Sequence, residues 1–412
     1  MDLAGIPISA WTPFLTTWDL ISVARVSTEL RTLVHDEADP PAPGGVVDIT
    51  GRVPYGRYLK KIFSRVQLTL SSHALEDDEV QGLDLVALDC GFRLSDTGIA
   101  TLTNLQYLTL YGYNNQITDA GLQKLQRVTY LDIGPPSKMR ITDVGLSSLR
   151  NLVSLKIEKI DSDYSKLTDH GLSGLTNLIY LNVGSGFTDE GIRHLVNLVH
   201  LQLHDNKVVT GTCFPSLTCL TTLGLGGCSG IRDENLCQLS NLTALDLFAT
   251  EGITDRGIMA LTRLTWLNLG RTEGITDDGL WPLTGLTDLD ISLTRGITGS
   301  CLQRFCLRTL GLRGGTDVRD SALCGIKVKT LDLCNNDTIT DEGLLSVDPE
   351  TLKCIYAGSL TTTSCVDELE RRGVRRMWWH QSTGPFCEFP RPPVGSRRPK
   401  KSPVAEFALF GD

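Results

Sequence analysis

The sequence predicts an α/β solenoid, an elongated series of short repeats that each contribute one strand and one helix. A hexapeptide of the form Ile-Thr-Asp-x-Gly-Leu recurs along the chain, for example at residues 117–122, 253–258 and 339–344. Each copy is followed by a second pattern, Leu-x-x-Leu-x-Leu, as at residues 242–247. Self-similarity at a short, regular period is the signature of a repeat array.

The Leu-x-x-Leu-x-Leu pattern predicts the strand of each repeat, because its apolar positions follow the period of a strand. Successive middle residues from Leu201 to Leu289 are 22 residues apart. Strands stacked about 4.8 Å apart would form one long parallel sheet. The predicted middle residues are Val66, Leu88, Leu108, Leu131, Leu155, Leu181, Leu201, Leu223, Leu245, Leu267, Leu289, Leu310, Leu331, Ile355 and Met377.

The hexapeptide predicts the start of a helix on the other side of each repeat. After it, apolar residues recur every three to four positions, which is a helical period. Thr118 or Asp119 can cap this helix, and a carboxylate is favourable at its positive end. Gly121 removes a side chain where the helix and strand layers must approach closely.

These patterns resemble the leucine-rich repeat, specifically the cysteine-containing class that F-box proteins carry, over residues 60–380. The resemblance implies a horseshoe-shaped solenoid with the parallel sheet on the concave face and helices outside. The family places a small polar side chain three residues after the last apolar strand position, where it satisfies loop backbone groups. Here this position holds Asn206, Cys228, Thr250, Thr272, Thr294 and Asn336.

The composition argues for an intracellular protein without a metal or cofactor. The 12 cysteines include no Cys-x-x-Cys pair, which favours buried structural thiols over metal ligands. We find no leader sequence and no run of about 18 apolar residues, so we expect no membrane segment and a cytoplasmic or nuclear location.

The net charge of −9 is unevenly distributed. Residues 371–401 hold nine Lys or Arg and one acid, a net of +8, so the remainder carries −17. An acidic array argues against nucleic acid binding along it. Residues 381–412 are Pro-rich and lack periodicity, which predicts disorder. Their segment 397–401 resembles a nuclear-import signal, although a solvated basic tail accounts for it better.

Residues 1–35 do not follow the repeat and predict a small helical segment, which residues 36–59 link to the array. The stretch from Phe14 to Leu33 resembles an F-box, and the match is poor before it. The first helix is shortened and contains Pro13, and Leu30 replaces the usual tryptophan. The resemblance implies binding to a Skp-type adaptor of a cullin ubiquitin ligase. The candidate adaptor contacts are Leu15, Leu20, Val23, Val26 and Leu30.

The resemblance therefore implies a substrate-recognition subunit of a Skp–cullin–F-box ligase, with a protein substrate on the repeat array. The alternative is a non-catalytic scaffold whose N-terminal helices only cap the solenoid. Side chains flanking each middle strand residue should line the concave face, where large aromatic residues favour a protein interface. The candidate aromatic contacts are Tyr130, Tyr180, His200, Phe248 and Trp266.

An enlarged loop around residues 159–166, beside the loop at 135–140, predicts a basic spot. With Lys138 and Lys159, it would suit a phosphorylated or acidic substrate segment. We expect no catalysis by this chain. Asp246, Asp288 and Asp290 could suggest paired carboxylates, but repeated strand positions explain them, and no phosphate loop or nucleophile–base motif accompanies them.

Overall fold

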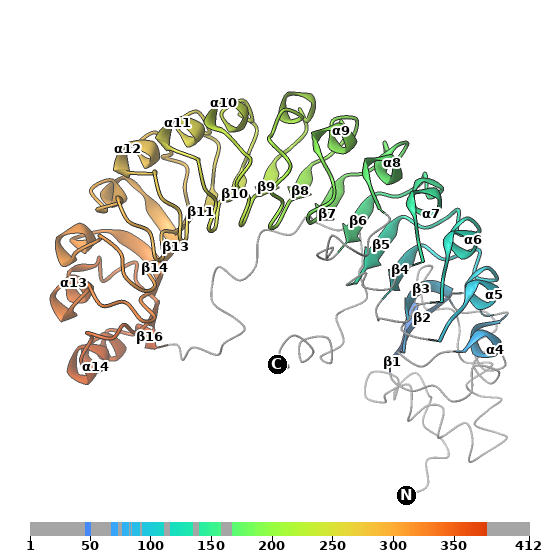
Figure 1. Cartoon of the computed structure of the whole chain (residues 1–412). Helices are drawn as coiled ribbons and strands as arrows, with labels where there is room; N and C mark the ends of the chain where they lie inside the picture. The colour runs from blue at the N-terminus through green and yellow to red at the C-terminus, as the bar shows by residue number, and fades with distance from the viewer. Residues whose placement is uncertain are drawn as a thin grey trace, which may run out of the picture. The chain divides into compact units, whose positions relative to one another are not determined.

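The computed structural model describes residues 46–50, 67–72, 76–81, 83, 85–90, 93–110, 116–134, 140–157 and 167–376. These residues belong to two compact units, of which the first ends at Asn177 and the second begins at Leu178. Each unit has the same construction, with strands along its inner side and helices along its outer side (Figure 1).

In the first unit, each strand pairs in parallel with the next one along the chain. Its strands are β1 (Val46–Thr50), β2 (Gln67–Ser72), β3 (Leu85–Cys90), β4 (Tyr107–Leu110), β5 (Tyr130–Ile133) and β6 (Ser154–Ile157). Its helices are α4 (Asp77–Val80), α5 (Asp96–Ile99), α6 (Asp119–Leu122), α7 (Asp143–Ser147) and α8 (Asp169–Leu172).

The second unit repeats this order with shorter central strands. Its strands are β7 (Tyr180–Val183), β8 (His200–Gln202), β9 (Thr222–Gly224), β10 (Ala244–Asp246), β11 (Trp266–Asn268), β12 (Asp288–Asp290), β13 (Cys306–Gly311), β14 (Lys327–Asp332), β15 (Cys354–Tyr356) and β16 (Arg375–Arg376).

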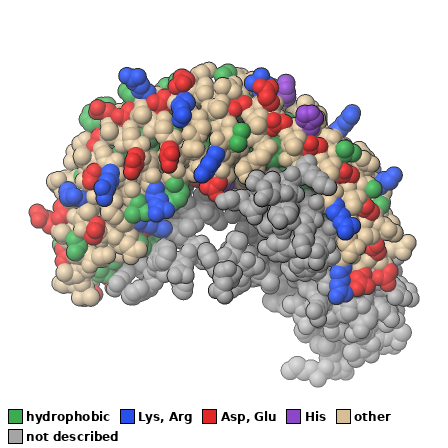
Figure 2. Space-filling view, in the orientation of Figure 1, with side chains coloured by type: hydrophobic (Ala, Val, Ile, Leu, Met, Phe, Trp, Pro, Cys, Tyr) green, Lys and Arg blue, Asp and Glu red, His purple; other side chains and the backbone are tan. Residues whose placement is uncertain are grey.

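The outer elements of the second unit are short α-helices and 3₁₀-helices. The α-helices are α9 (Asp189–Ile192), α10 (Asp233–Leu236), α11 (Asp255–Ile258), α12 (Asp277–Leu280), α13 (Asp341–Ser346) and α14 (Thr363–Arg371). The 3₁₀-helices are η2 (Phe214–Ser216), η3 (Leu302–Arg304) and η4 (Asp320–Leu323). Basic and acidic side chains are interspersed over this outer side (Figure 2).

The predicted strand centres match the observed register in the regular repeats. Leu223, Leu245 and Leu267 are paired partners and are fully buried. The first predicted centre is wrong, because Leu70 rather than Val66 pairs with Leu88. The last one is wrong by one residue, because Arg376 rather than Met377 pairs with Ile355. Strand β1 also lies within residues 36–59, where we expected only a linker; its Val-Val-Asp-Ile-Thr sequence is rich in β-branched residues, which suit a strand.

The threonine of the hexapeptide caps its own helix, whereas the aspartate bonds to the next repeat. The side chain of Thr118 accepts a hydrogen bond from the backbone of Ala120. Oδ1 of Asp96, one repeat earlier, accepts from the backbone N–H of Thr118 at 2.7 Å, and its Oδ2 accepts from the Thr118 hydroxyl at 2.6 Å. The same bond pair joins Asp119 to Thr142.

This link between repeats also explains the hexapeptide glycine. A Cβ atom on Gly121 would lie 2.4 Å from Oδ1 of Asp96, and one on Gly145 would lie 2.4 Å from Oδ1 of Asp119. The close approach is therefore to the aspartate of the preceding repeat, and not to the strand layer as we expected.

In the second unit, the predicted small polar residues after the strands satisfy loop backbone groups. The Asn206 amide donates to the carbonyls of Gly184 and Phe187, both at 3.0 Å, while its oxygen accepts from two backbone N–H groups. The Thr250 hydroxyl donates to the Leu225 carbonyl at 2.7 Å. The bonds that Asn206 and Thr250 donate tie their loops to the repeat before them.

Candidate functional site

The inner face of the first unit carries a tyrosine pair next to an ion pair. The rings of Tyr107 and Tyr130 lie 6.1 Å apart between centroids on neighbouring strands. The Tyr130 hydroxyl lies 3.4 Å from Oδ2 of Asp132, which also bonds Nζ of Lys156 at 3.3 Å. The positive charge of Lys156 is thus partly neutralised by Asp132.

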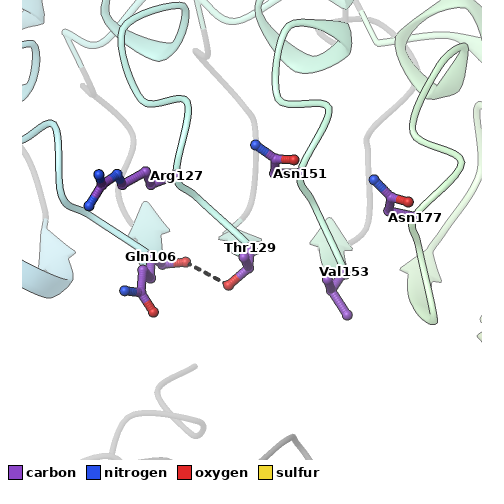
Figure 3. A pocket seen from close by; sticks show the side chains of 6 residues that line it. All are labelled: Gln106, Arg127, Thr129, Asn151, Val153 and Asn177. Atoms are coloured by element: carbon purple, nitrogen blue, oxygen red, sulfur yellow. Dashed lines mark hydrogen bonds between the residues drawn. The ribbon is translucent and has the colours of Figure 1, made fainter. Parts of the chain in front are cut away.

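An open depression of about 560 Å³ lies beside this face, at the edge where the chain enters β4, β5 and β6 (Figure 3). Five of its six lining side chains carry an amide, hydroxyl or guanidinium group, which suits the hydrogen-bonding groups of a polypeptide. The lining residues are Gln106, Arg127, Thr129, Asn151, Val153 and Asn177. Sequence reasoning missed this site, although Arg127, Asn151 and Asn177 each stand four residues before a middle strand residue.

In the second unit, Tyr180 and His200 occupy adjacent strands with their rings 6.4 Å apart. Oε1 of Gln202 accepts from the Tyr180 hydroxyl at 3.4 Å and from the Asn182 amide at 2.9 Å. His200 is buried, and burial lowers its pKa, so its ring is neutral at pH 7. These side chains form a fixed polar and aromatic group on the inner face.

The two remaining aromatic candidates differ in exposure. Trp266 is only 6% exposed, so it offers less contact surface than we expected from its place in the strand. Phe248 is 41% exposed and lies against the next repeat, where a Cβ atom on Gly270 would be 2.9 Å from its ring. Phe248 is therefore the more accessible of these two residues.

Acidic and amide residues follow the middle strand residues along the second unit, and their side chains shape the next turn. Oδ1 of Asp246 accepts from the Phe248 N–H at 2.9 Å, and Oδ1 of Asp290 accepts in the same way from Ser292. Asn268 makes this bond on the strand between them. We read this column as exposed contact residues, but the side chains act first as turn acceptors.

Carboxylates beside the middle strand residues, including Asp288, which could have suggested an enzyme, also bind basic side chains. Asp288 binds Arg308 through two bonds of 2.9 Å, and Asp332 binds Nε of Arg313 at 2.6 Å. Burial raises the pKa of Asp290, and the charge of Asp332 adds to the shift. Each carboxylate thus has a structural partner that accounts for its presence.

Some predicted site residues lie outside the described residues. They include the candidate adaptor contacts in residues 1–35 and the basic loop residues Lys138 and Lys159. Their roles stay predictions. Within the described part of the chain, no helix is long and apolar enough to cross a lipid bilayer.

A leucine-rich-repeat family model matches residues 238–261 and 326–347. Among solved structures, an internalin from Listeria monocytogenes is similar with a TM-score of 0.54 and 20% identity, covering 87% of this chain and 100% of its own. A leucine-rich-repeat protein from Leptospira interrogans is similar with a TM-score of 0.52 and 18% identity, covering 81% of this chain and 89% of its own. No curated protein sequence is significantly similar.

The repeat period, the parallel register and these comparisons agree. Repeat arrays of this kind expose a long surface whose side chains come from many successive strands, a geometry that suits protein partners. The chain therefore has the fold of a leucine-rich-repeat solenoid.

Proposed function

We propose that the chain is the substrate-recognition subunit of a Skp–cullin–F-box ubiquitin ligase. The observation that carries the proposal is the order of its parts. An F-box-like segment in residues 1–35 precedes a leucine-rich-repeat array of the class that F-box proteins carry. The array would hold a protein substrate, and the N-terminal segment would hold the adaptor. Ubiquitin transfer would then be promoted by a raised effective concentration of substrate, and the chemistry would belong to partner proteins.

The proposal is tested by recovery of a Skp-type adaptor with the tagged full chain. We expect Leu20→Asp combined with Val23→Asp to abolish recovery, because two buried charges would disrupt an apolar helix interface. A matched control places the same changes on the array, at Val144 and Val208, which are 59% and 53% exposed. Val144→Asp with Val208→Asp should retain the adaptor.

Thermal unfolding followed by circular dichroism checks that both double variants keep a folded array. Failure to recover any adaptor with the unsubstituted chain would contradict the ligase proposal. That result would favour the second candidate, a non-catalytic scaffold. The departures of residues 1–35 from the F-box pattern, notably Pro13 and Leu30, support this alternative.

A further inference from the structure

In the second unit, one position of the repeat changes from threonine to a basic residue partway along the sheet. The residue two before the middle strand residue is a threonine in four successive repeats, Thr221, Thr243, Thr265 and Thr287. The hydroxyl of each of the last three donates to the preceding threonine's carbonyl, at 3.0–3.2 Å. In the repeats of β13, β14 and β15 a cation replaces this threonine, and in β16 Arg375 pairs with Cys354, one position further along the strand. We define the basic column as Arg308, Lys329, Lys353 and Arg375.

The backbone ladder places the basic column on consecutive strands. The Arg308 N–H donates to the Thr287 carbonyl, the Lys353 N–H to the Lys329 carbonyl, and the Arg375 N–H to the Lys353 carbonyl. All four side chains are exposed. Adjacent strands lie about 4.8 Å apart, so the column extends over about 14 Å.

Two strands are lengthened where the column begins. Strands β13 and β14 have six residues each, against three in β12, and the extra residues bring exposed Lys327 beside exposed Cys306. Leu307 and Val328, which lie between the exposed residues, are buried. The strand extension thus adds a fifth cation, Lys327, next to the column.

Like charges on neighbouring strands destabilise a sheet, so this arrangement has a cost that the fold does not require. Arg308 is compensated by its bonds to Asp288. Among the described residues, no carboxylate forms an ion pair with Lys327, Lys329, Lys353 or Arg375. The Lys353 ammonium instead donates to the Glu350 carbonyl at 2.8 Å.

We propose that the basic column and Lys327 bind an extended segment of a protein partner that is rich in Asp and Glu. A segment of about four to five extended residues spans the column. Separate carboxylates fit better than one phosphate, because the cations are spread along a line. Lys327, Lys329 and Lys353 bind as single point charges, and the Arg308 guanidinium is already bound to Asp288 through two bonds.

The proposal rests on the proposed function only in treating the array as a protein-binding surface. Direct peptide binding does not need the adaptor, so each proposal can fail while the other holds. The test is fluorescence anisotropy of the full chain with a labelled peptide that alternates Glu and Asp. Its Gln/Asn counterpart serves as a neutral probe, and a third peptide carries the same charge concentrated on phosphoserine.

We expect the acidic peptide to bind and its affinity to fall as salt is raised, because exposed charges are screened. Lys327→Gln, Lys329→Gln and Lys353→Gln together should weaken binding about tenfold or more. The matched control, Lys124→Gln with Arg140→Gln and Arg150→Gln, removes the same charge from exposed residues of the first unit and should leave the affinity unchanged.

Equal affinity of the site variant and the unsubstituted chain would overturn the proposal, as would an equal loss in the control variant. Tighter binding of the phosphoserine peptide, or of an RNA oligonucleotide of equal charge, would also overturn it. Circular dichroism of the site variant excludes unfolding as the cause of a loss, because glutamine on an exposed strand keeps the backbone ladder.

Discussion

At the scale of single residues, the carboxylates after the inner strands combine a favourable bond with an unfavourable charge. Oδ1 of Asp246 accepts the Phe248 N–H, yet burial raises the pKa of Asp246, and the negative charge of Asp290 raises it further. The turn needs the hydrogen-bond acceptor of Asp246, but it does not need the negative charge. Asn268 makes the equivalent bond on the next strand without a charge.

We therefore expect Asp246→Asn to stabilise the protein by about 0.5–1 kcal/mol near pH 7, as measured by urea unfolding. A raised folded-state pKa means that the folded protein binds this proton more tightly than the unfolded chain. The unsubstituted protein thus gains stability as the pH falls through that pKa, and the advantage of the variant should shrink. A variant that is less stable at neutral pH would show that the charge itself matters.

At the scale of the element, the hexapeptide links one repeat to the next. Gly279 illustrates the constraint, because a Cβ atom there would lie 2.3 Å from Oδ1 of Asp255. The same oxygen accepts the Thr276 N–H at 2.8 Å. The glycine, the threonine and the preceding aspartate therefore work as one unit.

Gly279→Ala should cost about 1–3 kcal/mol in calorimetry or urea unfolding, because the added methyl group displaces the Asp255 carboxylate. Gly285→Ala is the matched control. Its Cβ atom would lie 3.3 Å from the Leu264 carbonyl oxygen, so a small adjustment suffices. The double variant Asp255→Ala with Gly279→Ala should lose less than the sum of its single changes. Additive losses would argue against a direct contact.

The sequence predicted these elements well wherever the repeat was regular. A leucine period of 22 residues allows only one pairing register between neighbouring strands. It could not tell which neighbour each hexapeptide aspartate would contact. Thr118 and Asp119 are both good helix caps, and only the spacing between repeats decides that the threonine caps and the aspartate bonds onward. The first predicted strand centre, which belongs to β2, was misplaced because no regular repeat precedes β2 to set its register.

At the scale of the whole molecule, the positions of the candidate contacts were predictable but their exposure was not. Period-two alternation placed His200 and Trp266 beside the middle strand residues. Exposure depends on packing by neighbouring side chains, which a single sequence does not state, and both residues are buried. The sequence places Arg308, Lys329 and Lys353 at the same position of successive repeats. Only the backbone hydrogen bonds between strands show that these residues lie side by side.

The stability of a repeat array is approximately a sum over repeats and their interfaces, so acid should act on the aspartates that join repeats. Asp277 accepts four hydrogen bonds from Thr298, Gly299 and Cys301. Burial alone would raise the pKa of Asp277, but these bonds outweigh it and the pKa is lowered. Asp189 shows the same balance.

A lowered folded-state pKa contributes stability that is complete above the unfolded-state value of about 4 and is lost as the pH falls through the folded value. Asp277→Asn should therefore cost about 1–2 kcal/mol near pH 7, because an amide N–H₂ faces backbone donors. The difference should shrink as the pH falls below about 4 and through the lowered folded-state pKa, where Asp277 of the folded protein becomes protonated. Urea unfolding across this range measures it, with exposed Asp278→Asn as the control. An undiminished difference at low pH would mean that the bonds depend on shape and not on the carboxylate charge.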